Sequence, residues 1–395
     1  MSASGPSRPA RRRPHVCVVG AGFAGAVMAE RAASLGLRVL VVEQREHIGG
    51  NAYDFRNEHG VLVHRYGPHI FHTNAPRVSG YLSRFTDWRA YEHRVLAEVE
   101  GQYVPMPINR TTINRLYGLR LGSDVEVQRY LDAVSEPCPL PRNSRDAVIA
   151  KVGEDMYAKL FRDYTRKQWA LDPSQLDASV CARLPVRTGS DDRYFTDDFQ
   201  QMPRDGYTAM FERLLEHPRI EVQTGVAHSD LGERAHVPLL VWTGPIDSYF
   251  DQRLGALPYR SLRFEFETRQ LADGGLLQPV AQINYPGAEY EYTRTTEFRH
   301  LTGESAEHTT IAYEYPTADG EPYYPVPRRE NRELYERYRA LAVAERGVVF
   351  VGRLARYQYL NMDQVVAQAL LAARRRFGAP AVASGSRRSR AVANA

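Results

Sequence analysis

Cysteine is scarce in this chain of 395 residues, which has only Cys17, Cys138 and Cys181. Their odd number and the lack of any CxxC spacing exclude a disulfide framework and a cysteine-based zinc site. A reducing compartment fits such a sequence best, and we therefore expect a cytoplasmic protein.

Long apolar runs and a strong excess of charge are missing as well. No window approaches eighteen apolar residues, so we expect no membrane-spanning helix and no membrane partner. The formal net charge is only +4 and the basic residues are spread along the chain, which argues against a nucleic-acid partner. The segments 1–13 and 380–395 are basic and have little to bury, and we expect both to be disordered tails.

Tyrosine, in contrast, is abundant, with 24 Tyr against 14 Phe. A tyrosine offers flat apolar area and a hydroxyl, which suits a pocket for sugars and phosphates. Tyrosine could equally replace phenylalanine in an ordinary core, and composition alone leaves both explanations open.

The segment "HVCVVGAGFAGAVMAERAASLGLRVLVVEQ" has the pattern of a strand, a helix and a second strand. Gly20, Gly22 and Gly25 form G-x-G-x-x-G where the helix begins, and the second strand ends on Glu43. The glycines permit a tight turn and let a pyrophosphate approach the helix N-terminus, whose free N–H groups favour anions. An acidic residue at about this offset meets a ribose hydroxyl. The pattern predicts a Rossmann-like domain that binds an adenine dinucleotide.

The rest of the chain changes pattern twice. Apolar residues recur at helical spacing over 147–169, and 110–119 and 124–134 also have the pattern of helices. The runs "RSLRFEFET", "PVAQINYP", "EYEYTRTTEF" and "TTIAYEYP" then alternate as strands of an antiparallel sheet do. "VPLLVWTGP" and "GVVFVG" contain short apolar strands of the buried parallel kind.

These patterns predict an α/β fold. A discontinuous Rossmann-like domain for the adenine dinucleotide is accompanied by a helical-bundle domain and an antiparallel β-sheet domain. The predicted boundaries are 14–85, 213–250 and 343–378 for the nucleotide domain, 108–180 for the helical domain, and 88–107, 181–212 and 258–340 for the sheet domain that takes the substrate.

The junction "GRLARYQYLNMDQV" follows the apolar run "GVVFV" and precedes an amphipathic helix. Asn361 is placed as the N-cap of that helix, with Gln364 three residues on. A capped helix does not explain why Arg353, Tyr357 and Tyr359 crowd the loop. We expect the junction to present a helix N-terminus to a bound cofactor.

From about His15 to Phe377 the sequence resembles the UDP-galactopyranose mutase family, flavin-dependent isomerases of nucleotide sugars. The resemblance rests on ordered stretches that include "VVGAGFAGA", "HIGGNAYD", "YGPHIFHTN", "YTRKQW", "RLPVR", "TGPIDSYFD", "EPYYPV" and "GRLARYQYLNM". It implies FAD as cofactor, an external reductant such as NAD(P)H, and a homodimer. It also implies the reaction: N5 of the reduced flavin attacks the anomeric carbon of an NDP-hexose, the nucleotide departs, and the sugar recloses as a furanose without net redox change.

The resemblance also assigns roles to residues. Arg183 and Arg294 match diphosphate-binding arginines and Arg353 matches another near the cofactor, a role that suits the fixed guanidinium fork. Matches to phosphate-binding tyrosines are Tyr194, Tyr324 and Tyr359, and matches on the nucleoside and sugar side are Tyr164, Trp169 and Asn284. Tyr164 also lies on the apolar helical stripe, so a place in the core is an alternative for it. Gly50, Asn51 and Met362 lie in the stretches that match flavin-binding segments.

Histidines are the remaining candidates. His69 and His72 match positions beside the flavin, where an imidazole that titrates near neutrality could assist proton movements. His64, His69 and His72 also tempt a metal assignment, but no carboxylate or cysteine completes a ligand set, so we expect no metal. The residues with an expected catalytic role are therefore Arg183, Arg294, His69, His72 and Asn361.

The chain departs from the family pattern at several positions. Asn361 stands where the family usually has Asp, "TGSDD" where it commonly has a segment such as "FTFDN", and "KQWA" and "YGPH" where "KQWG" and "YGAH" are usual. Asn361 keeps the helix cap but removes a negative charge. This leaves two substrates level: UDP-galactopyranose, and the 6-deoxy sugar of dTDP-fucopyranose, for which a lost polar contact suits a missing hydroxyl.

Other function classes stay open at this point. A flavin oxidoreductase of the amine-oxidase type shares the dinucleotide domain but does not need a set of arginines and tyrosines for a diphosphate. A non-catalytic protein that binds nucleotide sugars would not need Gly20, Gly22, Gly25 and Glu43.

Overall fold

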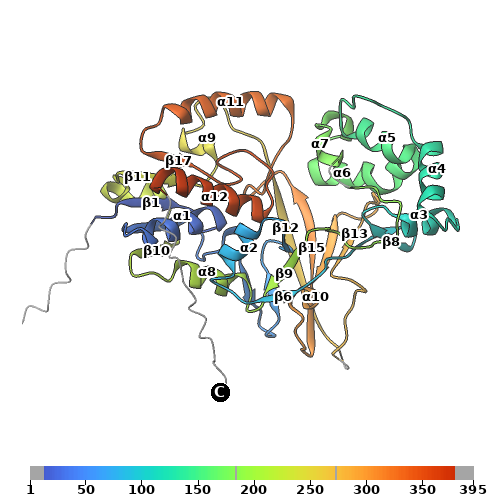
Figure 1. The fold of residues 1–395 in the computed structure, drawn as a ribbon, viewed down its shortest axis with the longest axis horizontal. Helices are drawn as coiled ribbons and strands as arrows, with labels where there is room; N and C mark the ends of the chain where they lie inside the picture. The colour runs from blue at the N-terminus through green and yellow to red at the C-terminus, as the bar shows by residue number, and fades with distance from the viewer. Residues whose placement is uncertain (1–12, 183–184, 272–273, 379–395) are drawn as a thin grey trace, which may run out of the picture.

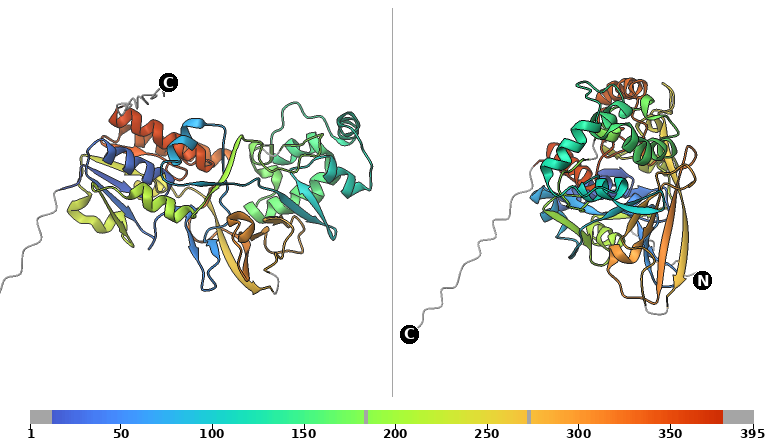
Figure 2. Two further views of the ribbon diagram at one scale, coloured as in Figure 1. Left: turned by 60° about the horizontal axis from the view of Figure 1, so that its bottom comes forward. Right: turned by 90° about the vertical axis from the view of Figure 1, so that its right-hand side faces the viewer.

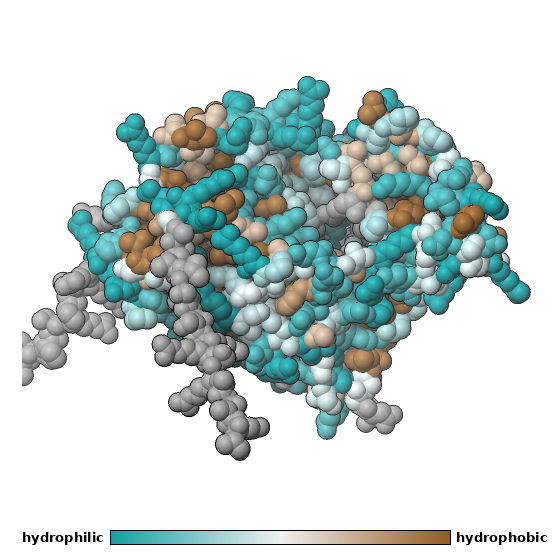
Figure 3. Space-filling view, in the orientation of Figure 1, coloured by the Kyte–Doolittle hydropathy of each residue, from teal (hydrophilic) through white to brown (hydrophobic). Residues whose placement is uncertain are grey.

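The computed structural model describes residues 13–182, 185–271 and 274–378. A parallel sheet with its helices lies at one end of the molecule, a group of helices lies at the other, and long β-strands run between them (Figures 1 and 2). In the space-filling view the surface is notched between the end that carries α11 (Arg329–Ala344) and the group of helices at the opposite end (Figure 3).

The parallel sheet collects strands from distant parts of the chain. Within the described residues its order is β10 (Ile220–Thr224), β2 (Val39–Glu43), β1 (Val16–Val19), β11 (Leu239–Trp242) and β17 (Val348–Phe350). All neighbouring pairs are parallel, and β2 is buried along its whole length. The predicted α/β class with a Rossmann-like sheet is confirmed. The domain boundaries drawn from the sequence stay a prediction.

Two helices cover one face of this sheet. α1 (Phe23–Ser34) and α12 (Met362–Phe377) pack side by side, and α8 (Tyr207–Leu215) joins them through Phe211, which lies 4.7 Å from Phe23 between ring centroids. A separate apolar cluster joins α9 (Ile246–Tyr249), α11 and the junction after β17. Helices from the two ends of the chain therefore share one core with the sheet.

A second, larger sheet has seven strands among the described residues. Among the described residues its order is β16 (Tyr324–Pro325), β12 (Tyr259–Gln270), β15 (His308–Thr317), β14 (Arg294–Glu297), β13 (Gln282–Asn284), β7 (Val95–Val99) and β8 (Gln102–Met106). The four predicted strands are present and pair antiparallel. Against the expectation of a purely antiparallel sheet, β13 pairs parallel with β7, because the earlier hairpin β7–β8 adds to its edge.

The helical end consists of α3 (Arg110–Tyr117), α4 (Asp124–Val134), α5 (Ser144–Tyr157), η2 (Ala158–Arg162), α6 (Asp163–Trp169), η3 (Pro173–Gln175) and α7 (Ser179–Ala182). The predicted helices are there, but the stripe over 147–169 is not one regular helix. Gly153 has φ +79°, and a Cβ on it would lie 2.2 Å from the carbonyl oxygen of Val134. The close approach of α4 therefore bends α5, and a π-helical turn, η2, follows before α6.

Small elements complete the fold: β3 (Asp54–Arg56) with β4 (Leu62–His64), β5 (Phe71–Thr73) with β9 (Phe199–Pro203) and β6 (Trp88–Ala90), and the short helices η1 (Gly50–Ala52), α2 (Pro76–Leu82), η4 (His228–Ala235) and α10 (Phe298–Thr302). No helix in the described ranges is both long and apolar enough to span a bilayer.

Candidate active site

The turn between β1 and α1 is formed by the predicted glycines. Gly20 has φ +99°, and a Cβ there would lie 2.1 Å from Oγ1 of Thr243. A Cβ on Gly25 would lie 1.9 Å from the carbonyl oxygen of Gly20, so no side chain fits where the helix packs on the turn. Gly22 faces Gly50, and a Cβ on Gly50 would lie 2.9 Å from the Cα of Gly22. The backbone is therefore bare on both sides of the α1 N-terminus, which is the arrangement that admits an anion.

Glu43 is held at the end of β2 by backbone donors. Its Oε2 accepts from the N–H of Ala21 at 2.9 Å, and its Oε1 accepts from the N–H of Arg45 at 3.0 Å. The residue is 7% exposed and lines a cavity. An ionised carboxylate has more acceptor sites than these bonds use, so it can still accept from a ribose hydroxyl.

A large cavity, about 690 Å³ in volume, joins these features. Of the residues predicted to bind the cofactor, its lining includes Gly20, Gly22, Glu43, Gly50, Asn51, Arg353 and Met362, whereas Gly25 lies inside the first turn of α1. Asn51 Oδ1 accepts from Arg45, whose guanidinium also pairs with Glu321 across the lining. The residues that line the cavity extend from the glycine turn to the junction after β17. A cavity of this extent fits a dinucleotide.

His69 lies on this cavity, but not in the state expected from the sequence. Its Nδ1 must donate to the carbonyl of Gly67, 2.9 Å away, and its backbone N–H donates to Nδ1 of His64 at 3.1 Å. Burial, with a smaller effect from His64, lowers the pKa of His69 to about 3. This shift disfavours an imidazolium at neutral pH, and the catalytic role expected for His69 stays a prediction. The ring is neutral, and its Nε2 is left as an acceptor.

His72 takes a different place. Its Nδ1 lies 2.9 Å from Oδ2 of Asp197, and its ring stacks on Phe195 with centroids 3.6 Å apart. His72 does not belong to the lining of the large cavity as far as the described residues define it. The structure thus separates the two histidines that the sequence grouped together.

A smaller cavity of about 90 Å³ brings together most of the predicted substrate residues. Its lining includes Tyr164, Trp169, Asn284, Arg294, Tyr324 and Tyr359. They come from α6, from the strands β13, β14 and β16, and from the junction after β17, so distant segments build one wall each. Tyr164, for which a place in the core was the alternative, reaches this cavity, and burial raises its pKa to about 12.

Arg294 is the charged group of the smaller cavity. Its Nε and Nη2 lie 2.9 and 2.8 Å from Oε1 of Glu314, which is 3% exposed. Burial opposes the charge of Arg294, but the carboxylate of Glu314 holds its pKa well above its ordinary value. Burial raises the pKa of Glu314 against the pull of Arg294. The ion pair fixes the guanidinium plane, which leaves the guanidinium charged and aimed at the cavity.

The two cavities adjoin at an aromatic stack. The rings of Tyr324 and Tyr359 stack with centroids 5.3 Å apart and line the smaller cavity, whereas Tyr323 lines the larger one. Arg353, which lines the larger cavity, lies 5.7 Å from the ring centroid of Tyr324 and 5.3 Å from that of Tyr359. Arg353 and this stack therefore stand between the two cavities.

The residues of the crowded junction after β17 lie in different places: some belong to the core and others line a cavity. Tyr357 has φ +45°, and its hydroxyl donates to the carbonyl of Pro258 at 2.6 Å within the α9–α11 cluster, so it is part of the core. Met362 and Val365, at the start of α12, line the large cavity. Asn361 begins the helix as predicted, and its N–H donates to Oε1 of Gln364 at 2.9 Å. Asn361 itself is exposed and lies outside the described lining of both cavities.

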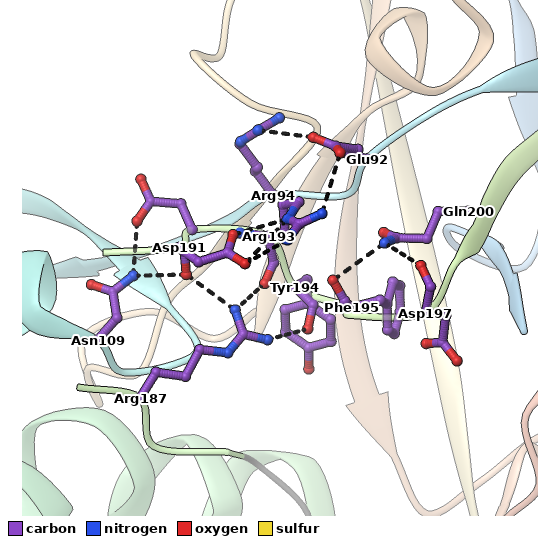
Figure 4. A network of polar contacts seen from close by, with 11 residues as sticks. Glu92, Arg94, Asn109, Arg187, Asp191, Arg193, Tyr194, Phe195, Asp197 and Gln200 are labelled. Carbon is purple, nitrogen blue, oxygen red and sulfur yellow. Dashed lines mark hydrogen bonds and ion pairs between the residues drawn. The ribbon is translucent and has the colours of Figure 1, made fainter. Parts of the chain in front are cut away.

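Tyr194 lies near the smaller cavity rather than on its described lining. Its backbone N–H donates to the carbonyl of His93 at 2.7 Å, and its phenol helps to raise the pKa of Tyr164 after burial. Arg187 fixes this segment, because its guanidinium donates to the carbonyls of Asp191 at 3.0 Å and of Tyr194 at 3.3 Å (Figure 4). Arg183 lies outside the described residues.

Sequence reasoning missed residues that only the fold brings to the site. Gln168 lines the smaller cavity, and its Oε1 is buried without a hydrogen-bond partner among the described residues. Glu314 was not singled out, although it orients Arg294. Gln168 stands inside the quoted stretch "YTRKQW", so a residue-by-residue reading of that stretch could have found it.

Comparison with known proteins agrees with this geometry. A family model described as "GLF: UDP-galactopyranose mutase" matches residues 159–359, and one described as "NAD(P)-binding Rossmann-like domain" matches residues 18–85. The chain is 38% identical to a probable UDP-galactopyranose mutase of Klebsiella pneumoniae, over 90% of this chain and 93% of that one. It is 35% identical to a dTDP-fucopyranose mutase of Escherichia coli, over 90% and 96%.

The fold has a solved counterpart. The crystal structure of a reduced UDP-galactopyranose mutase matches with a TM-score of 0.74 at 17% identity, over 92% of this chain and 96% of that one. Together with the sequence matches and the two adjoining cavities, this leads to one assignment. The chain belongs to the UDP-galactopyranose mutase family, whose members are isomerases.

Proposed function

We propose that the protein is a flavin-dependent mutase that interconverts UDP-galactopyranose and UDP-galactofuranose. The observation that carries this proposal is the contact between the linings of the two cavities, where Arg353 of the larger one lies against the Tyr324–Tyr359 stack of the smaller one. A dinucleotide in the larger cavity, and a nucleotide sugar whose base end enters the smaller one, would bring their reactive ends together there; at about 90 Å³ the smaller cavity takes only part of the nucleotide sugar.

The residues of the large cavity fit FAD. The bare glycine backbone at the α1 N-terminus suits the pyrophosphate, and Glu43 suits a ribose hydroxyl. Met362 and Val365 supply an apolar surface near the junction. Reduced flavin, when bound, supplies a nucleophilic nitrogen for the anomeric carbon and recovers its state at the end of each cycle. The flavin would need prior reduction by an external donor such as NAD(P)H.

The protein's own residues hold the departing nucleotide. Arg294 points its fixed guanidinium into the smaller cavity, and Arg353 adds a second charge where the cavities meet. Charge-assisted bonds to phosphate are each worth about 1.5–3 kcal/mol, so this pair stabilises both the bound substrate and the expelled diphosphate. Arg183, matched through "RLPVR", is proposed for the same role.

The smaller cavity suits the base of the nucleoside. The amide of Gln168 complements the imide edge of uracil, because its buried Oε1 can accept from the ring N–H and its Nε2 can donate to a ring carbonyl. Tyr164 and Trp169 offer flat faces for stacking. Leu160, Phe161 and Val180 line the same cavity and exclude water.

His69 serves the sugar end as a neutral acceptor. Its Nε2 is free to accept a hydrogen bond from a group in the cavity, since Nδ1 donates to Gly67. Because the pKa is about 3, the ring does not carry a stored proton at neutral pH. His72, which lies on Asp197, supports the segment before β9 and is not proposed to touch the flavin.

Two candidate substrates, UDP-galactopyranose and dTDP-fucopyranose, differ in both sugar and base. The exposed position of Asn361 gives no support to the idea that this residue selects a 6-deoxy sugar. We therefore place UDP-galactopyranose first and dTDP-fucopyranose second. Incubating dithionite-reduced protein with both compounds, and analysing the products, ranks them. Conversion of neither would reject the proposal, whereas oxygen or NAD(P)H consumed in step with product would favour an amine-oxidase-type reaction.

Assembly is a separate proposal, namely a homodimer. It follows from the family and is checked by light scattering of the purified protein. A monomer at micromolar concentration would contradict it without affecting the proposed reaction.

A further inference from the structure

Lys167 lies on α6, between Tyr164 and Trp169, and does not point into either cavity described above. Its Nζ donates to backbone carbonyls of the segment that joins β13 to β14. The distances are 2.6 Å to Tyr285, 2.7 Å to Gly287, 3.0 Å to Tyr290 and 3.1 Å to Tyr292. An ammonium group has three protons, so these carbonyls share its charge as oxygen ligands share a cation.

The segment that Lys167 holds is part of the smaller cavity. It begins after Asn284, includes Pro286 and ends before Arg294, and these three residues line the cavity. On the other side, α6 contributes Tyr164, Gln168 and Trp169 to the lining. Lys167 therefore ties the helical wall of the cavity to the wall formed by the segment between β13 and β14.

The tie is electrostatic and partly shielded from water. Burial lowers the pKa of Lys167 to about 8, against the opposing effects of Glu289 in the loop and Asp163 on the same helix. The guanidinium of Arg260 also donates hydrogen bonds to the backbone carbonyl of Lys167, at 3.4 Å, and to that of Gln168, at 2.9 Å. The helix end is thus held from the sheet side as well as from the loop side.

We propose that Lys167 is a positioning residue: it sets the separation of the α6 wall and the 285–292 wall, and through it the affinity for the nucleotide. This inference rests on the proposed function, because it takes the occupant of the smaller cavity to be the base end of the nucleotide. The loop itself, however, responds to Lys167 whether or not a nucleotide is bound.

The first test needs no ligand. Amide hydrogen exchange over 285–292 is compared among the wild type, Lys167→Met, Lys167→Arg and Arg166→Met. Arg166 is the matched control because it is the adjacent cation, is half exposed, and pairs with Asp163 and Asp172 outside the cavity. Faster exchange of the loop in Lys167→Met alone, with partial recovery in Lys167→Arg, is expected. Unchanged exchange in Lys167→Met overturns the inference, whatever the nucleotide does.

The second test uses UDP as the probe, with each protein in its flavin-loaded form. Lys167→Met is expected to raise the Kd for UDP about 10-fold, because binding must then order the loop, while the flavin spectrum and kcat change far less. A purely structural role would instead lower flavin content, kcat and affinity together. If the wild type itself binds neither UDP nor dTDP, the proposed function fails, and the exchange experiment still decides the role of Lys167.

A pH series separates charge from packing. The charged side chains that act on Lys167 are Glu289 and Asp163. Arg260 donates to the backbone carbonyl of Lys167, and Tyr285, Tyr290 and Tyr292 meet its Nζ through their backbone carbonyls; burial raises the pKa of the Tyr285 and Tyr292 phenols to about 12. Wild-type affinity for UDP should weaken as pH rises through about 8, whereas Lys167→Arg should stay level up to about pH 8.5, below the range in which the N–H of the uracil ring itself ionises. The same decline in both proteins would contradict a role for the ammonium charge.

Discussion

Arg294 rests on the buried carboxylate of Glu314, with Nε and Nη2 both within 2.9 Å of the same oxygen. The pair sits on adjacent strands, β14 and β15, which are in register at these two residues. Its effect is to fix the orientation of a guanidinium before any ligand arrives. Such preorganisation lowers the cost of binding a diphosphate.

Replacing Arg294 by Lys tests this orientation. A lysine keeps the charge but cannot bond Glu314 and a phosphate with one planar fork, so UDP affinity should fall about 10- to 100-fold. Isothermal titration with UDP measures it. Arg263→Lys is the matched control, because Arg263 lies exposed on β12 and pairs with Glu265. Equal affinity of Arg294→Lys and the wild type would show that Arg294 does not hold the diphosphate.

Replacing Gly50 by Ala tests the proposed FAD site. A Cβ there would lie 2.9 Å from the Cα of Gly22 at a φ of +57°, a strain of about 1–3 kcal/mol against the cofactor-binding backbone. The flavin-to-protein absorbance ratio should fall. Gly80→Ala is the control, since nothing lies within 4 Å of its added Cβ. Full flavin loading in Gly50→Ala would contradict the site.

Replacing Gln168 by Leu tests recognition of the base. Loss of an amide that pairs with the imide edge should weaken UDP binding about 10-fold but leave CDP, which lacks that imide, nearly unchanged. The ratio of the two affinities is the readout. Gln128→Leu, an exposed change on α4, should preserve the ratio. A preference for UDP that survives in Gln168→Leu would place the base elsewhere.

The buried histidines predict how stability depends on pH. Burial lowers the pKa of His64 to about 4 and that of His93 to about 3, and the two residues are 1% and 2% exposed. As pH falls below about 6.5, these histidines bind protons in the unfolded chain but stay neutral in the folded chain. Protonation therefore favours the unfolded chain, and the free energy of unfolding decreases. Each group contributes up to about 1.4 kcal/mol per pH unit.

Urea unfolding at pH 7.5 and pH 5.0 measures this loss, in a range above the titration of most unfolded carboxylates. His93→Gln should reduce the difference between the two free energies, whereas His59→Gln, at an exposed position, should leave it unchanged. Identical unfolding free energies at both pH values in the wild type would contradict the prediction.

The sequence predicted the elements better than it predicted their contacts. The glycine turn, β1, α1, β2 and the later parallel strands follow from local periodicity and from residues that only one backbone shape admits. The bend at Gly153 could not be predicted, because it depends on how close α4 approaches. The parallel pairing of β13 with β7 likewise joins segments almost two hundred residues apart.

The site divides in the same way. The family motifs gave Arg294, Tyr324 and Tyr359, which the fold brings to one cavity. Periodicity and motifs do not predict which carboxylate will pair with a buried arginine, or which amide oxygen will be buried without a hydrogen-bond partner. Glu314 and Gln168 were therefore missed. Tyr357 and Tyr359 illustrate the limit: two residues apart on a loop, one enters the core and the other the cavity.

The proposed reaction is an isomerisation without net redox change, beside Arg353 and the Tyr324–Tyr359 stack. The most direct measurement is anaerobic incubation of the dithionite-reduced protein with UDP-galactopyranose, with NMR of the sugar pool and the flavin absorbance followed together. We expect a furanose anomeric signal that grows over many turnovers while the flavin stays reduced. No furanose, or a product whose amount equals the flavin oxidised, would contradict it.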